Sequence, residues 1–123
     1  MLGDSQWTRF ACEAVDWALP SQSLQHGGFL NLEQSDAPGA LSAVYLEAVA
    51  AVLHATGKAR YGAAMRNGLG FLDRLTYQAR DAAVLPHFEA AEGGLRSSLT
   101  ASEVRLDFVQ HAISALLNLE ATR

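Results

Sequence analysis

The spacing of apolar residues along this chain predicts four main α-helices. In four stretches the apolar positions recur every three or four residues, which is the period of one helical face. Turn-forming residues separate the stretches. The predicted helices are a first one from Asp4 or Ser5 to Pro20, a second over 41–55, a third over 58–77 and a fourth from about Ala101 to Asn118 or Glu120. The fold class expected is all-α.

Residues that favour helix ends mark several of these boundaries. Pro20 ends the first helix, because proline has no backbone N–H to continue it. Gly57 is expected to cap the second helix in a left-handed conformation. Thr100 and Glu103 have the spacing of a capping box, which predicts that the fourth helix starts between them. The stretch 78–94 is then a long connection, which is uncommon in compact domains unless it packs on itself or has a function.

The apolar pattern also predicts which helix faces are buried. One face of the first helix is expected to carry its apolar side chains, at positions 7, 10, 11, 14, 15 and 18. The second helix is apolar nearly all round and is expected to be buried on more than one side. In the third helix we expect Gly62, Gly68 and Gly70 to permit close helix packing, since each glycine otherwise weakens a helix by roughly 1 kcal/mol.

The two halves of the chain repeat one another. Helix, glutamine, paired glycines and a second helix occur in the same order in units of about 4–57 and 58–120. The matched segments are Gln22 with Gln78, 27–29 with 93–95, and 44–49 with 104–109. Repeated helix pairs usually leave an apolar face for a neighbouring unit to cover. The sequence therefore predicts two helical hairpins in a single domain.

The repeat resembles the helical hairpins of the α/α-toroid proteins, in particular the squalene-hopene cyclase and protein prenyltransferase group. An aromatic-rich helix end, a glutamine and a glycine-aromatic turn recur in their hairpins. The matching residues are Trp17, Gln22, Gly28 and Phe29 in the first unit, and Phe71, Leu72, Gln78, Gly94 and Leu95 in the second. The resemblance implies part of an α/α toroid, although Leu95 stands where an aromatic residue is expected.

The catalytic features of that group are absent from this sequence. No Asp-Asp pair occurs, and the only cysteine, Cys12, lies on the first predicted helix rather than in a zinc-binding set. The cyclase and prenyltransferase activities are therefore not expected here, and no metal or cofactor is predicted. Complete toroids also contain more hairpins than two. The chain is therefore expected to be a fragment or a shortened relative that associates with other chains, or else the two hairpins form an ordinary four-helix assembly.

Composition supports association and narrows the class of partner. Half of the 123 residues are apolar and only 18% are charged, which suggests that a partner covers part of the surface. The formal charge is -4 and the basic residues form no stripe, so nucleic acid is not an expected partner. We expect a homo-oligomer or a complex with another protein chain, with a small-molecule ligand also considered.

The location expected is the cytoplasm. The first five residues lack the basic flank and apolar stretch of a signal peptide. No apolar run approaches the roughly 20 residues that span a bilayer. Cys12 is compatible with a reducing compartment, and among apolar helix positions it is expected to be a small buried side chain.

Three polar residues are candidates for catalysis. Asp107 and His111 are four residues apart on one helix, so the carboxylate can orient the imidazole and raise its pKa. Glu47 occupies the position of the first unit that corresponds to Asp107. Two inward carboxylates could act as acid and base in glycoside hydrolysis, but each could equally solvate a helix face or pair with arginine.

A second group of candidates could bind an anion or another ligand. Arg96, followed by two serines near the start of the fourth helix, could hold a carboxylate, sulfate or phosphate. Pairing of Arg96 with Glu92 or Glu103 is the simpler expectation. Arg105 and Gln110, like His111, replace apolar residues of the first unit, Tyr45, Ala50 and Ala51. This difference between the units marks the place expected for a site.

Two hypotheses of function follow. The first is a binding or assembly module that associates through apolar helix faces. The second is an enzyme of the α/α-barrel type acting on a carbohydrate or an isoprenoid, with Asp107 and His111 in its site and Glu47 or Arg96 assisting. The sequence does not decide whether the protein is an enzyme.

Overall fold

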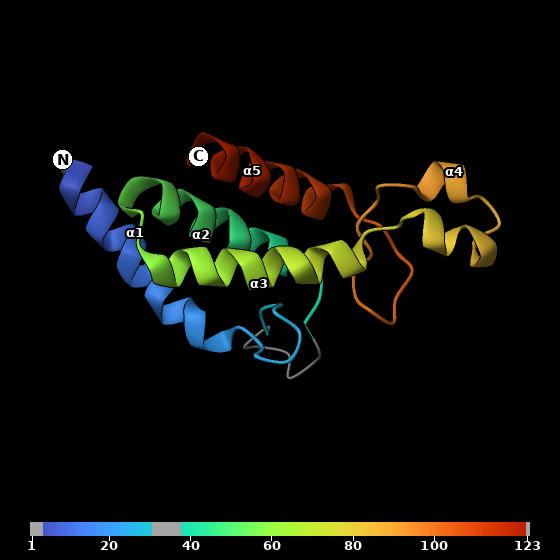
Figure 1. Cartoon of the computed structure of the whole chain (residues 1–123), viewed down its shortest axis with the longest axis horizontal. Coiled ribbons are helices and arrows are strands. Elements are labelled where there is room, and N and C mark those ends of the chain that lie inside the picture. The colour runs from blue at the N-terminus through green and yellow to red at the C-terminus, as the bar shows by residue number, and fades with distance from the viewer. Residues whose placement is uncertain (1–3, 31–37, 123) are drawn as a thin grey trace.

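The computed structural model describes residues 4–30 and 38–122, and within these ranges the chain is mostly helical and forms no sheet. The all-α prediction is thus confirmed. Four helices are long: α1 Asp4–Ala18, α2 Ser42–Thr56, α3 Ala59–Leu75 and α5 Leu106–Thr122. Three elements are short: the 3₁₀ turns Leu19–Ser21 and Ala79–Val84, and α4 Phe88–Ala91. Figure 1 shows their arrangement.

Helix α2 is the centre of the molecule. It packs against α1, α3 and α5, which surround it on three sides (Figure 1). Leu46, Val49 and Val52 are almost completely buried, as are the alanines Ala43 and Ala50. The predicted burial of α2 on more than one side is confirmed. Its C-terminus also follows the prediction, because Gly57 has a φ of 65° and its N–H donates to the Leu53 carbonyl.

Helices α2 and α3 approach each other closely at Gly68. A Cβ at this position would lie 2.3 Å from Cδ2 of the buried Leu46, so the contact requires glycine. Gly70 has no atom within 4 Å of its hypothetical Cβ, and the nearest atom to that of Gly62 is at 3.7 Å. The predicted role of glycine in close helix packing therefore holds for Gly68 alone.

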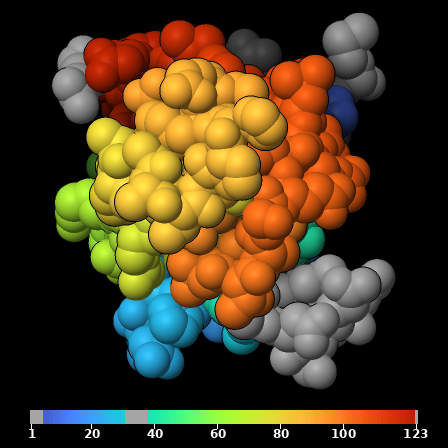
Figure 2. Space-filling model, turned by 90° about the vertical axis from the view of Figure 1, so that its right-hand side faces the viewer, coloured from blue at the N-terminus to red at the C-terminus, as the bar shows by residue number. Residues whose placement is uncertain are grey.

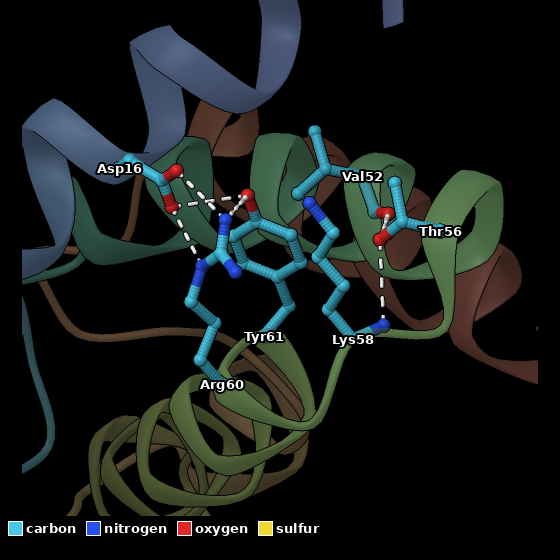
Figure 3. A network of polar contacts seen from close by, with 6 residues as sticks. All are labelled: Asp16, Val52, Thr56, Lys58, Arg60 and Tyr61. Atoms are coloured by element: carbon cyan, nitrogen blue, oxygen red, sulfur yellow. Dashed lines mark hydrogen bonds and ion pairs between the residues drawn. The ribbon is translucent and has the colours of Figure 1, made fainter. Parts of the chain in front are cut away.

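A polar cluster joins α1 to the start of α3 (Figure 3). The Arg60 guanidinium donates two hydrogen bonds to the Asp16 carboxylate, at 2.9 and 2.8 Å, and a third to the Tyr61 hydroxyl at 2.8 Å. The Tyr61 hydroxyl donates to Asp16 at 3.0 Å. The Arg60 hydrogen bond lowers the pKa of Asp16, and burial raises the pKa of Tyr61 to about 12, with the Cys12 thiol as the next cause. The cluster fixes the position of α1 beside α3.

The paired glycines form equivalent turns in both hairpins, but the glutamines are not equivalent. Gln22 pairs with Phe29 in an isolated antiparallel bridge, and the residue that pairs in the same way with Leu95 is Thr76. The expected match of Gln22 with Gln78 is therefore wrong by two positions. Gln22 donates side-chain hydrogen bonds to the carbonyls of Gly27 and Ala64, both at 2.9 Å, and so holds its turn against α3.

The fourth long helix begins later than the sequence predicts. Residues 101–105 are not helical, and α5 starts at Leu106. The Ser98 hydroxyl accepts the backbone N–H groups of Thr100 and Ala101, at 3.3 and 3.0 Å, and Val104 pairs with Arg96. The predicted capping box is wrong because these contacts hold the segment in an extended path.

The segment 95–105 is hydrogen-bonded to the residues before α2 at one end of the molecule. The Ala40 N–H donates to the Ser97 carbonyl at 2.9 Å, and the Ser97 N–H donates to the Glu103 carbonyl at 2.8 Å. Figure 2 shows that this end is covered by the segment containing α4 and by the stretch that leads to α5. The predicted long connection 78–94 contains Ala79–Val84 and α4.

Gly68 and Gly70 of α3 give a paired test of this packing. Gly68→Ala is expected to destabilise the fold by about 1–3 kcal/mol, because Leu46 has no free space to retreat into. Gly70→Ala is expected to stabilise it by up to about 1 kcal/mol through helix propensity alone. Urea unfolding followed by circular dichroism measures both. Equal effects of the two substitutions would contradict the close approach at Gly68.

Candidate functional site

Two of the three catalytic candidates meet between α2 and α5. These helices run parallel, with Glu47 beside His111 at one level and His54 beside Thr122 further along (Figure 1). Nδ1 of His111 forms a hydrogen bond with the Glu47 carboxylate. Their side chains are 35% and 34% exposed, so the pair lies at the edge of the helix contact. The hydrogen bond from His111, followed by one from the Ser114 hydroxyl, lowers the pKa of Glu47.

The third catalytic candidate has a different partner. The Asp107 carboxylate accepts hydrogen bonds from the guanidinium of Arg105, at 3.2 and 2.9 Å. The Arg105 guanidinium also lies over the Phe108 ring, 4.9 Å from its centroid. The expected pair of Asp107 with His111 is therefore replaced by two others, because Arg105 directly precedes α5 and Glu47 faces His111 from α2.

The arrangement does not resemble a set for nucleophilic catalysis. A serine nucleophile needs its hydroxyl against the base, whereas the Ser114 hydroxyl bonds to the carboxylate of Glu47. Asp107, the second carboxylate of the glycosidase hypothesis, is in an ion pair with Arg105. Within the described residues no group of three or more His, Cys, Asp and Glu side chains could hold a metal ion. The Glu47 and His111 pair acts in this geometry as a link between two helices.

Arg96 makes structural contacts at the end of α3. Its Nε donates to the Leu75 carbonyl at 3.2 Å and an Nη donates to the Arg74 carbonyl at 2.6 Å. These carbonyls lie at the C-terminus of α3, which carries partial negative charge. The predicted anion site relied on a positive helix end beside Arg96, and α5 begins ten residues later, at Leu106. The expected partners Glu92 and Glu103 are replaced by these backbone carbonyls.

The last ligand candidate, Gln110, is exposed on α5. It lies one turn from the exposed side chains of Leu106 and Ile113, on the outward face of the helix. The structure thus does not bring Gln110 together with Arg96, which lies at the end of α3. Five of the six candidates fall into three separate groups: Glu47 with His111, Arg105 with Asp107, and Arg96 on the α3 carbonyls. The sixth, Gln110, faces outward.

The most prominent surface feature is an apolar row on α1, which sequence reasoning assigned to the core. Trp7, Phe10 and Trp17 are 54%, 61% and 70% exposed, and Ala14 lies exposed between them. These four residues, spaced three, four and three apart, are called the α1 stripe below. The buried face of α1 is the adjacent one, with Cys12, Val15 and Ala18. The expected burial of Trp7 and Phe10 is therefore wrong, and that of Cys12 is confirmed.

An apolar groove adjoins the α1 stripe. It has a volume of about 290 Å³, and its lining is almost entirely apolar. Its walls include Ala14, Trp17 and Ala18 of α1 and Val44, Tyr45 and Ala48 of α2. We call it the α1–α2 groove. The sequence contains a signal for both features, because the apolar positions of α1 are too many for one face and fall into two adjacent rows.

Comparisons with protein-family models, with curated proteins and with solved structures gave no match. In the part of the chain that the structure describes, no helix is long and apolar enough to cross a membrane.

The Glu47 and His111 contact predicts a pH dependence of stability. Because the folded-state pKa of Glu47 lies below its ordinary value of 4.5, the contact stabilises the fold above that pH and is lost as the pH falls through the folded value. For a partly exposed pair the effect is at most about 1 kcal/mol. Glu47→Gln is expected to weaken the acid dependence of urea unfolding.

A matched control is Glu89→Gln, which alters an exposed residue on α4. This variant is expected to keep the wild-type dependence. If Glu47→Gln gave the wild-type profile below pH 4.5 as well, the carboxylate would not carry the link between α2 and α5.

Proposed function

We propose that this protein is a binding or assembly module, which associates with a second copy or another protein chain through uncovered apolar helix faces. The α1 stripe carries the proposal. Large aromatic side chains in a continuous row, beside an apolar groove, are typical of the anchors of protein interfaces. Isolated exposed apolar residues are common, but a row on one helix face is not.

A second uncovered face supports the same proposal. On α5, Leu106, Ile113 and Leu117 are 82%, 52% and 66% exposed, and their spacing places them on one side of the helix. We call these three residues the α5 stripe. The two stripes lie on helices that both pack against α2. A chain built of repeated hairpins has such faces wherever a neighbouring unit is missing.

The proposal includes a relationship to part of an α/α toroid. Support comes from the parallel packing of α2 and α5, which are the second long helices of their hairpins, and from the equivalent glycine turns. It also includes a cytoplasmic location, which is compatible with the free and buried thiol of Cys12.

A small-molecule site is the second candidate, and the α1–α2 groove favours it. Its volume is near the lower end of ligand pockets, which are about 300–1,000 Å³. The groove lacks the convergent polar groups that orient a substrate, and neither Asp107 nor His111 belongs to its lining. The enzyme hypothesis therefore gains no support from this pocket.

Light scattering after size exclusion, over a range of protein concentrations, tests the proposal. We expect the molar mass to rise above the 13.2 kDa of one chain as the concentration increases, or a monomer that binds an apolar dye such as anilinonaphthalene sulfonate. The second result fits association with another chain. A strict monomer that binds no apolar dye would contradict the proposal.

A further inference from the structure

The α1 stripe is symmetric along its helix. The intervals between its residues are three, four and three, so the spacing is the same in both directions about position 12. These intervals are those of the facing positions in a pair of packed helices. Such a row can pack against an identical row that runs in the opposite direction.

The antiparallel alignment pairs large side chains with small ones at its centre. Phe10 of one copy comes opposite Ala14 of the other, and this pairing occurs twice about the two-fold axis. At the ends, Trp7 of one copy comes opposite Trp17 of the other. Because Trp17 borders the α1–α2 groove, the incoming Trp7 also finds an apolar surface beside its partner. A parallel alignment would place Phe10 against Phe10 and Ala14 against Ala14, which packs less evenly.

The charges beside the stripe favour the same orientation. Arg9 and Glu13 lie next to the stripe on one side, and both side chains are at least 70% exposed. Their contact within one chain is long, with 3.9 Å between the closest atoms. An antiparallel partner brings Arg9 of each copy to nearly the same level as Glu13 of the other. In a parallel pair, the flank that carries Arg9 and Glu13 in one copy lies on the opposite side of the interface from the same flank of the other copy, so this contact between copies is lost.

We propose that two copies of this chain form a dimer in which their α1 helices pack antiparallel through the α1 stripe. This inference rests on the proposed function and names its partner as a second copy. The three aromatic side chains expose roughly 400 Å² per chain, if each has a total area of about 200–250 Å². If all of this surface were covered, two copies would bury roughly 800 Å² there, which is below the roughly 1,200 Å² of stable specific interfaces and is the size of a weak, transient contact. The dimer is reversible.

The α5 stripe is less suited to such pairing. Its three aliphatic residues are interrupted by Gln110, and it contains no tryptophan or tyrosine, the residues that most often anchor interfaces. It therefore supplies the matched control surface.

Sedimentation equilibrium of the full chain tests the interface. The wild-type protein is expected to be a dimer whose dissociation constant is raised at least tenfold by Phe10→Glu, because this residue occurs twice near the two-fold axis. Leu117→Glu introduces the same charge on an equally exposed site of α5 and is expected to leave the constant unchanged. Circular dichroism checks that both variants keep the wild-type helix content.

Charge exchange tests the orientation. Arg9→Glu and Glu13→Arg are each expected to weaken the dimer several-fold, and the double variant is expected to restore it, since each carboxylate again faces a guanidinium. In a parallel dimer these flanks of the two copies would lie on opposite sides of the interface, so none of the exchanges would act between the copies. Absence of restoration in the double variant would therefore overturn the antiparallel arrangement.

The outcomes separate this inference from the broader proposal. A dimer dissociated by Leu117→Glu and unaffected by Phe10→Glu would overturn the α1 dimer and leave an assembly module that uses α5. A monomer that binds the apolar dye would overturn self-association and leave a module for another chain. A strict monomer without dye binding would overturn both.

Discussion

The enclosure of α2 by three helices is the constraint on which the rest of this structure depends. It requires small residues at the contacts: alanines on α2, Ala115 on α5 and Gly68 on α3 are all buried. Each brings two helix backbones close together, and close backbones increase the dispersion contacts of the larger side chains around them. The fourth side of α2 is open. Ala48, Ala51 and Ala55 of α2 are exposed, and Ala48 lines the α1–α2 groove.

Several polar contacts in the described part of the chain hold helices and turns in place relative to one another. Arg60 joins α1 to α3 through Asp16, Arg96 satisfies the last carbonyls of α3, and Glu47 joins α2 to α5 through His111. Only 18% of the residues are charged. The charged side chains that are candidates for a functional site are therefore also the ones that can form contacts between helices. The contacts of Arg60, Arg96 and Glu47 are thus structural.

The features predicted correctly from the sequence are those that depend on neighbouring residues. Gly57 ends α2 because it adopts a left-handed conformation and its N–H bonds to the Leu53 carbonyl of the preceding turn. The start of α5 could not be found in this way, since Arg96 and Ser98 hold the residues before Leu106 away from the helix. Likewise, the i, i+4 spacing of Asp107 and His111 could not predict the hydrogen bond of the His111 imidazole, because its partner Glu47 is 64 residues away in the sequence.

The buried face of α1 shows a different limit of sequence reasoning. Two adjacent apolar rows occur on this helix, and hydrophobicity alone favours the row that contains the tryptophans. The row that is buried contains smaller residues, Cys12, Val15 and Ala18, because α1 must approach α2 closely. Shape complementarity with α2 decides which row turns inward, and that information lies in a different part of the chain.

Backbone contacts at one end of the molecule join the two halves of the chain. Ala40 of the first hairpin bonds to Ser97 of the second, and α5 covers α2 along most of its length. Cutting the chain at Gly57 would therefore expose the core face of α2 in one fragment and that of α5 in the other. α2 and α5 therefore share one core, and neither half of the described chain contains a complete core by itself.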